Sequence, residues 1–196
     1  LFINHYPFKE RNKFRPRLLW VRSFHEIYNP IMAVRVLYEL KKTYHNVQLC
    51  MVGPEKDNSL DEVVKLAEKL LISDNLNITG KLSKTQWSEL ATSYDIFINT
   101  TNIDNNPVSI IEAMALGLPV VSTSAGGISK LISSGKTGLL VEKDNVEEMV
   151  ANILSIIEMK AIGKMLSKNA RQMVEEFDVR LIIPKWYKLI DGIIND

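Results

Sequence analysis

Short apolar runs alternate along this chain with longer stretches in which apolar residues recur every three or four positions. The short runs are typical of buried strands, and the longer stretches are typical of amphipathic helices. The predicted strands lie at residues 17–22, 47–53, 76–80, 95–100, 118–123 and 136–142. The predicted helices lie at residues 29–44, 59–71, 83–93, 107–117, 145–159, 161–177 and 180–194, with a shorter one at 126–135.

Strands that alternate with helices predict a parallel sheet, because a right-handed crossover needs a helix's length of chain to return. The fold class is therefore α/β, namely a Rossmann-like domain of three layers with roughly six parallel strands and additional C-terminal helices. The expected parts are a lead-in, the domain and a terminal helix, at residues 1–16, 17–175 and 176–196. Two helix starts show the spacing of a capping box, at Ser59 with Glu62 and at Ser83 with Gln86.

Composition limits the classes of function. Of the 196 residues, 46% are hydrophobic, and 24 basic side chains nearly balance 23 acidic ones. These values are typical of a soluble globular protein and give no reason to expect a nucleic-acid partner. The basic segment, as we call it, leads into the first predicted strand and contains Lys9, Arg11, Lys13, Arg15 and Arg17. It could face phosphate or an anionic membrane surface, but its lack of a helical apolar face favours a solvated lead-in.

Cysteine usage and the apolar runs bear on location. Cys50 is the single cysteine, so no intramolecular disulfide forms, and a reducing compartment fits. No apolar run approaches the ~20 residues that span a bilayer, and the charged N-terminal stretch is not typical of a signal peptide. The sequence therefore predicts a cytoplasmic protein. Because it opens on Leu1 and has no methionine before Met32, we expect a fragment of a longer protein.

Polar and glycine residues follow the predicted strands at the points where they end. In a parallel α/β sheet the carboxyl ends of the strands meet at one edge, and ligands bind there. The residues expected on this rim are Arg22, Gly53, Pro54, Gly80, Lys81, residues 100–106 and residues 122–127. The three histidines show no metal-binding spacing, and the hydrolase, P-loop and dinucleotide-binding glycine motifs do not occur. We therefore expect no metal and no resident cofactor.

The helix that follows Asn106 offers the clearest chemistry. Asn106 is a good N-cap and Pro107 suits the first helical position, so the free N–H groups of Val108 and Ser109 would point at the rim. Free N–H groups at a helix N-terminus favour a phosphate. Glu112 lies about one and a half turns further on, where its carboxylate can reach the same rim and accept hydrogen bonds from a vicinal diol.

These residues also have purely structural interpretations. Glu112 could face solvent, but its neighbours are apolar or small, and an unpaired buried carboxylate is unfavourable. Arg22 could clamp a phosphate or form a salt bridge with Glu26. Gly126 and Gly127 could form an ordinary turn or offer N–H groups to an anion.

One long segment resembles a known family. Asp104, seven further residues and Glu112 are followed by AMALGLPVVSTSAGGISKLISSGKTGLLV, which resembles the donor-site signature of the GT-B glycosyltransferases of family 4, also called group 1. The segments LLWVRSFHEIYNP, LCMVGPE and NITGKLSKTQW fall where that family has its other strand ends. The resemblance covers nearly the whole chain, but it corresponds only to the C-terminal half of such an enzyme, the half that binds the nucleotide-sugar.

The resemblance implies roles for individual residues. Glu112 would hold the ribose hydroxyls of the nucleotide, and Asp104 would contact the transferred sugar. Arg22 would bind the diphosphate beside Val108 and Ser109. The other residues implied in donor binding are Gly80, Lys81, Leu82, Asn106, Pro107, Gly126 and Gly127.

Three positions depart from the family pattern. Asp104 replaces the usual Glu and is one methylene shorter, and by itself it could simply form the turn of an Asn-rich loop. Ile27 and Tyr28 stand where family members commonly have Lys-Gly, so a lysine on the diphosphate is missing. Pro107 removes one possible N–H donor.

The resemblance implies the donor-binding domain of a retaining glycosyltransferase, which moves a sugar from a nucleoside diphosphate sugar to an acceptor hydroxyl without a metal. A catalytically inactive nucleotide-sugar sensing module is the alternative, and a GT-B epimerase lacks sequence support. The implied partners are the donor and a missing N-terminal acceptor domain, against which residues 176–196 would pack. The longer enzyme could act in cell-envelope polysaccharide synthesis at the inner face of a membrane. This chain alone is expected to bind a nucleotide weakly and to transfer nothing, and the sugar, base and acceptor stay open.

Overall fold

The computed structural model describes residues 1–194, in which six parallel strands form one sheet. The strands are β1 Arg17–Val21, β2 Gln48–Val52, β3 Leu76–Gly80, β4 Ile96–Asn99, β5 Val120–Thr123 and β6 Leu139–Val141. Their order in the sheet is β3-β2-β1-β4-β5-β6. The predicted Rossmann-like α/β fold is confirmed, and several strands are shorter than predicted.

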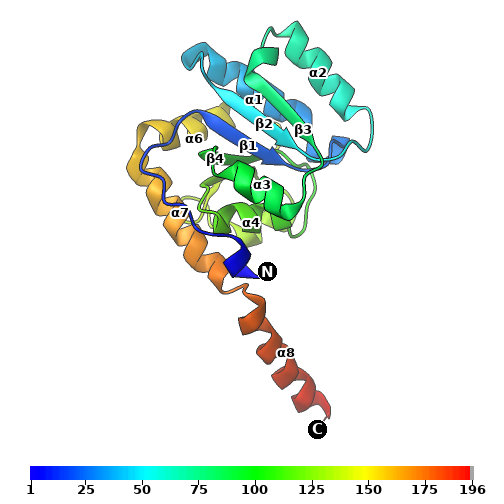
Figure 1. Ribbon diagram of the computed structural model, residues 1–196, viewed down its shortest axis with the longest axis vertical. Coiled ribbons are helices and arrows are strands. Elements are labelled where there is room, and N and C mark those ends of the chain that lie inside the picture. The colour runs from blue at the N-terminus through cyan, green and yellow to red at the C-terminus, as the bar shows by residue number, and fades with distance from the viewer. Residues whose placement is uncertain (195–196) are drawn as a thin grey trace.

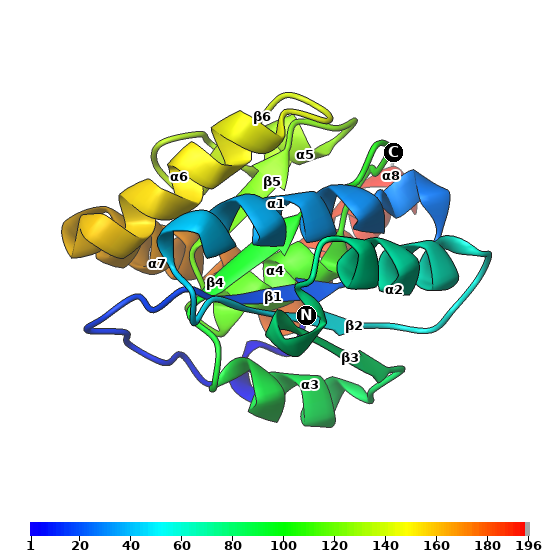
Figure 2. The ribbon, with the colours of Figure 1, turned by 90° about the horizontal axis from the view of Figure 1, so that it is seen from above.

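Helices cover both faces of this sheet, which gives the predicted three layers (Figure 2). The helices on one face are α1 Pro30–Thr43, α2 Ser59–Lys69 and α6 Val146–Glu158. The helices on the other face are α3 Lys84–Ala91, α4 Val108–Ala115, α5 Ile128–Leu131 and α7 Lys160–Glu175. Short 3-10 turns lie at Ile3–His5, Glu26–Tyr28 and Ser73–Asn75, and the last described helix is α8 Val179–Ile194.

The central strand β1 is buried on both faces. Leu18 and Trp20 pack into the core beneath α1, whereas Leu19 packs into the core beneath α4, because successive residues of a strand point to opposite faces. All three side chains are fully buried. Helices on both faces therefore explain why the strands read as continuous apolar runs rather than as alternating patterns.

Capping chemistry matches the prediction at α3 and differs at α2. The predicted capping box is confirmed in α3, where Ser83 Oγ accepts the N–H of Gln86 at 3.3 Å and Gln86 Oε1 accepts the N–H of Ser83 at 2.9 Å. The predicted capping box of Ser59 and Glu62 is wrong, because Ser59 is already the first residue of α2. Asp57 accepts the N–H of Ser59 at 2.9 Å instead and so begins the helix.

Helix α4 begins one residue later than predicted. Pro107 is the N-cap, with an extended backbone of φ −70° and ψ 102°, so the prediction that Asn106 caps this helix is wrong. No side chain caps α4, because proline carries no acceptor on its side chain. The carbonyl of Pro107 accepts the N–H of Ile110 at 3.0 Å. The N–H groups of the first turn before Ile110 are therefore left for another acceptor.

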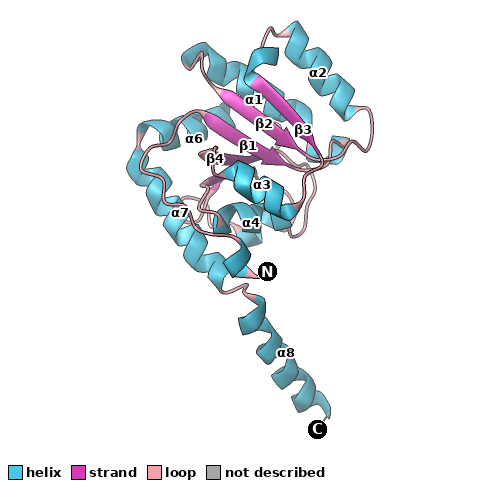
Figure 3. Cartoon of the chain, viewed as in Figure 1, coloured by secondary structure: helices cyan, strands magenta, loops and turns pink. Residues whose placement is uncertain are grey.

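The two ends of the chain differ in packing. Within residues 1–16, Ile3, Tyr6 and Phe14 are buried against the helices of the domain. Helix α8 instead leaves the body of the molecule (Figures 1 and 3). Its exposed large apolar side chains are Leu181, Ile183, Trp186, Tyr187, Leu189 and Ile190. Packing of α8 against another domain stays a prediction. Among residues 1–194, no helix is long and apolar enough to cross a bilayer.

The strand order reverses direction at β1, which lies between β2 and β4. In open α/β sheets, ligands bind outside the carboxyl ends of the strands at such a switch point. Arg22 follows β1 at this point, and the segment that begins at Thr100 follows β4. The fold thus brings the predicted rim residues of these two strands to the place where a ligand is expected.

Candidate functional site

Backbone packing fixes the position of Arg22. Its N–H donates to the carbonyl oxygen of Val52 at 3.0 Å. Gly53 lies so close that a Cβ built on it would stand 1.7 Å from the carbonyl oxygen of Arg22. The N–H of Gly53 donates in turn to the carbonyl of Gly80 at 2.9 Å. Glycine at position 53 is therefore required for the ends of β1, β2 and β3 to approach one another.

The guanidinium of Arg22 is held on three sides. Its Nη2 forms an ion pair with Asp104, and its Nε donates to Asn99 Oδ1 at 3.3 Å. The guanidinium also lies 5.1 Å from the centre of the Tyr28 ring. Burial lowers the pKa of Arg22, and the charge of Asp104 opposes that shift. The alternative of a salt bridge with Glu26 is wrong, because the loop after β4 brings Asp104 to Arg22 across the switch point.

Asn99, the last residue of β4, was missed by sequence reasoning. Its side chain is fully buried, and its Nδ2 donates to Ser122 Oγ at 2.9 Å while its Oδ1 accepts from Arg22. A buried amide needs partners for both its donor and its acceptor atoms. Its only signal in the sequence is one amide at the end of an apolar strand. Asn99 connects Arg22 to β5 and so orients the guanidinium.

The loop that carries Asp104 packs directly on the two glycines after β5. A Cβ on Gly126, whose φ is +56°, would stand 2.2 Å from the carbonyl oxygen of Asp104, and one on Gly127 would stand 1.9 Å from that of Asn105. The N–H of Gly127 donates to the carbonyl of Asp104 at 2.9 Å, so it is not free for an anion. The N–H of Gly126 has no acceptor among the described residues. The pair of glycines therefore positions Asp104 as well as leaving one N–H donor.

The N-terminus of α4 carries unpaired donors. Among the described residues, the N–H groups of Val108 and Ser109 have no acceptor. Ser109 is only 9% exposed, and its Oγ is buried without any hydrogen-bond partner in the same part of the chain. Two other residues of this turn are predicted to bind the donor. Of these, Pro107 is buried and Asn106 is exposed. Three unpaired donors at one helix N-terminus are an arrangement that favours an anion.

Glu112 lies on α4 and is only 4% exposed, so the interpretation of a solvent-facing residue is wrong. Tyr6 Oη donates to Glu112 Oε1 at 2.5 Å, and Lys84 Nζ lies 2.8 Å from the same oxygen. Burial raises the pKa of Tyr6, and the bond to Glu112 raises it further. Oε2 has no donor among the described residues. We call Tyr6, Lys84 and Glu112 the carboxylate clamp, and sequence reasoning found neither Tyr6 nor Lys84.

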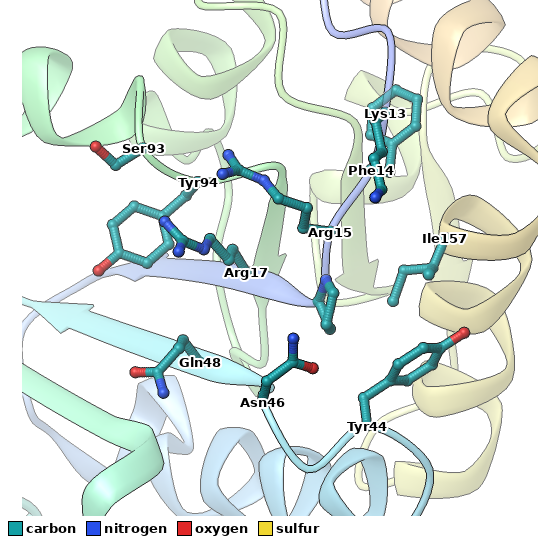
Figure 4. A pocket seen from close by; sticks show the side chains of 11 residues that line it. Lys13, Phe14, Arg15, Arg17, Tyr44, Asn46, Gln48, Ser93, Tyr94 and Ile157 are labelled. Atoms are coloured by element: carbon teal, nitrogen blue, oxygen red, sulfur yellow. The ribbon is translucent and has the colours of Figure 1, made fainter.

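The residues after β3 complete the predicted set. Gly80, with φ +71°, offers its carbonyl to Gly53, as described above. Lys81 is exposed, and Leu82 is half-buried against the core beneath α4. A cavity of about 320 Å³ lies beside the carboxylate clamp and is lined in part by Tyr6 and Lys84. A second cavity, of about 670 Å³, lies at the amino ends of β1, β2 and β4, away from the carboxyl ends where the candidate site lies (Figure 4).

The described part of the chain contains no group of three or more His, Cys, Asp or Glu side chains that could hold a metal ion. His25 Nδ1 instead accepts the N–H of Ile27 at 3.1 Å, a local bond. Cys50 is a free, buried cysteine, and burial raises the pKa of its thiol. The donors and acceptors available at the switch point are therefore an arginine, amides, hydroxyls and carboxylates.

Comparisons with known proteins bear on the family and the fold of the chain. The family described as "Glycosyl transferases group 1" matches residues 4–173. An uncharacterized glycosyltransferase of Haemophilus influenzae is 28% identical over 154 residues, which cover 78% of this chain and 42% of the relative. The capsular polysaccharide biosynthesis glycosyltransferase CapM of Staphylococcus aureus is 26% identical over 160 residues, which cover 81% of this chain and 40% of the relative. The chain thus spans less than half the length of these two relatives.

A solved structure shows the same fold. The crystal structure of Anabaena Alr3699/HepE in complex with UDP-glucose matches with a TM-score of 0.86 at 19% sequence identity. The match covers 98% of this chain and 56% of that chain. This likeness establishes the fold of the chain and leaves its ligand to the chemistry of the site.

Proposed function

Because this chain belongs to the group 1 glycosyltransferases, we propose that it is the nucleotide-sugar-binding domain of a longer, retaining glycosyltransferase. The longer enzyme would move a hexose-type sugar from a nucleoside diphosphate sugar to an acceptor hydroxyl bound by a domain outside this chain. The UDP-glucose in the Anabaena structure supports a donor of this class. The similarity to CapM supports a role in cell-envelope polysaccharide synthesis. We also propose that the longer enzyme acts at the cytoplasmic side of a membrane.

The proposal is carried by one observation, the buried Ser109 Oγ that has no partner among the described residues. A buried hydroxyl without a partner destabilises a fold by about 1–3 kcal/mol. A phosphate at the N-terminus of α4 would accept a bond from this hydroxyl and from the N–H groups of Val108 and Ser109. The helix dipole adds positive potential at the same place. One phosphate of the nucleotide-sugar would therefore satisfy hydrogen-bond donors that residues 1–194 leave unpaired.

Arg22 supplies the cation for the diphosphate. Asn99 and Tyr28 hold its guanidinium, and Asp104 balances its charge. When a donor binds, the diphosphate becomes the anionic partner of Arg22, and Asp104 becomes free to accept a hydroxyl of the sugar. After this exchange the side chain of Asp104 is long enough for its role, because it needs to reach only a sugar that lies next to Arg22.

The sugar leaves the diphosphate more easily when the charge that develops on the leaving group meets fixed donors. Arg22 and the first turn of α4 are held by the fold before any donor binds, so little reorganisation is needed during the reaction. Glu112 would bind the ribose through Oε2, since Tyr6 and Lys84 already engage Oε1. Gly80, Lys81 and Leu82, at the end of β3, would flank the base.

Calorimetric titration of this chain with UDP, GDP and ADP tests the proposal. We expect saturable binding of at least one of these nucleotides, and we expect Arg22→Ala to weaken it by about tenfold, the effect of losing one charge-assisted hydrogen bond. Arg35→Ala is the matched control, because Arg35 is exposed on α1 and the substitution removes the same charge. Equal binding by both variants, or no binding of any nucleoside diphosphate, would contradict the proposal.

A second function, nucleotide-sugar binding without transfer, rests on a different observation. Ile27 and Tyr28 replace the Lys-Gly pair of the family, and the ring of Tyr28 lies against Arg22 where a second cation would add to the diphosphate site. A transfer assay on the longer protein separates the two functions. Turnover of a nucleotide-sugar supports the transferase, whereas tight binding without turnover supports a sensing module.

A further inference from the structure

We propose that the cavity at the amino ends of β1, β2 and β4 binds a soluble phosphorylated small molecule, at a site separate from the donor rim (Figure 4). Its volume of about 670 Å³ falls within the ~300–1,000 Å³ that small-molecule sites occupy. The rim lies at the carboxyl ends of the same strands, so the sheet separates the two sites. Nothing in the proposed donor chemistry uses the residues of this cavity.

Three cations from the basic segment line the cavity. Lys13, Arg15 and Arg17 are lining residues, and no lining residue is acidic. Phe14 and Leu18 are buried in the core, whereas the three cations beside them along the chain are exposed or half-buried. Burial of these two apolar side chains anchors the segment to the core and leaves the cations beside them facing the cavity. The cations are therefore gathered at the cavity by the packing of their apolar neighbours.

The described residues do not neutralise most of this positive charge. Arg15 Nε donates to Asp95 Oδ2 at 2.7 Å, and Arg11 Nε lies 3.7 Å from the other oxygen of the same carboxylate. Asp95 is thus already balanced by two arginines. Lys13 and Arg17 form no ion pair and no side-chain hydrogen bond with any described residue. Two cations are left to bind an anion.

Neutral donors face the same space. The side chains of Asn46, Gln48 and Ser93 line the cavity and have no hydrogen-bond partner among the described residues. Figure 4 shows Arg17 beside Tyr94 on one side of the cavity and Asn46 beside Tyr44 on the other. Phosphate oxygens accept bonds from lysine, arginine, amide and hydroxyl donors alike. A phosphorylated ligand fits this set of donors better than a cation or an apolar molecule does.

The shape of the cavity and the residues that line it favour a soluble ligand over a lipid headgroup. A surface that binds membranes combines basic residues with exposed apolar side chains that enter the bilayer. None of the exposed large apolar side chains in the described part of the chain lines this cavity. The cations here line one part of a recess, which suits a small molecule that can enter it.

The test is a titration of the isotope-labelled chain with sodium tripolyphosphate, followed by nuclear magnetic resonance. We expect saturable shifts of the backbone amides of Asn46, Gln48 and Ser93. The double variant Lys13→Ala/Arg17→Ala should bind at least about tenfold more weakly, because it loses two charge-assisted contacts. An unchanged urea unfolding midpoint shows that this variant is folded.

The matched control is Lys65→Ala/Lys69→Ala, which removes the same charge from the exposed side of α2. It should bind tripolyphosphate as the parent chain does. Equal weakening by both double variants would show diffuse attraction and overturn the proposal, as would unsaturated shifts at these amides. Cosedimentation with phosphatidic acid vesicles that depends on Lys13 and Arg17, without any response to tripolyphosphate, would assign the cavity to a lipid headgroup and overturn the soluble ligand.

Discussion

Replacing Ser109 by alanine should change stability and ligand binding in opposite directions. The hydroxyl of Ser109 is buried and has no partner in the part of the chain that the structure describes, and burying such a group costs about 1–3 kcal/mol. Alanine removes that cost, and its helix propensity is more favourable than that of serine by a few tenths of a kcal/mol. The small void left by the hydroxyl offsets part of this stabilisation. We expect the free energy of unfolding to rise by about 1 kcal/mol, which raises the melting temperature by about 2–4 °C.

The same substitution should weaken nucleotide binding. In the proposed complex, Ser109 Oγ donates to a charged phosphate oxygen, and losing such a bond costs about 1.5 kcal/mol, or about tenfold in the dissociation constant for UDP. Urea unfolding of the free chain and calorimetry with UDP measure the two effects. Ser167→Ala is the control, because Ser167 Oγ is buried but donates to the carbonyl of Gly117 at 2.7 Å. That variant should lose about 1 kcal/mol of stability and bind UDP normally. A Ser109→Ala chain that is less stable and binds UDP as the parent does would refute the reasoning.

Three further outcomes follow from the contacts of the site. Tyr6→Phe removes one of the two bonds to Glu112 Oε1. It should weaken UDP binding without changing pyrophosphate binding in calorimetry, because in the proposed complex only the ribose contacts Glu112. Gly53→Ala places a Cβ 1.7 Å from the carbonyl of Arg22 and should lower the unfolding free energy by about 1–3 kcal/mol, measured in urea, and weaken UDP binding as well. Burial and a hydrogen bond with Cys50 raise the pKa of Tyr94 from 10.0 to about 12. The contribution of the neutral Tyr94 side chain to the free energy of unfolding is therefore complete below pH 10.0 and is lost as the pH rises to about 12. Urea unfolding across this range should therefore show a smaller alkaline loss of stability in Tyr94→Phe than in the parent chain.

The order of the strands and helices could be predicted because the local hydrophobic pattern and the need to cover both faces of the sheet favour the same fold. Apolar runs of strand length lie between amphipathic helices, and the sheet needs both faces covered, so one parallel arrangement fits. Glu112 could be identified as a buried acid from its apolar neighbours alone. The capping box of α3 needed only four consecutive residues, Ser83 to Gln86, and it was found for that reason.

The partners of the site residues could not be predicted, because they are far apart in the chain. Tyr6 and Glu112 are separated by 106 residues, and Arg22 and Asp104 by 82 residues. Glu26, the alternative partner for Arg22, lies only four residues from it in the sequence. Only the switch point between β1 and β4 brings Asp104 to Arg22.

The first turns of α2 and α4 show why a single residue type does not identify the N-cap of a helix. Asn106 and Ser59 both have the side chains that N-caps prefer, yet neither caps its helix. At α4 the extended backbone of Pro107 delays the helix by one residue. That delay leaves the first turn without a side-chain cap and so leaves its donors for a ligand.

A crystal structure of this chain with UDP tests the central claim most directly. The account predicts that a phosphate of UDP accepts hydrogen bonds from Ser109 Oγ and the first N–H groups of α4, that Arg22 contacts the diphosphate, and that Glu112 Oε2 accepts the ribose hydroxyls. A nucleotide bound elsewhere, with Ser109 Oγ still unpaired and Arg22 still bound only to Asp104 and Asn99, would contradict it.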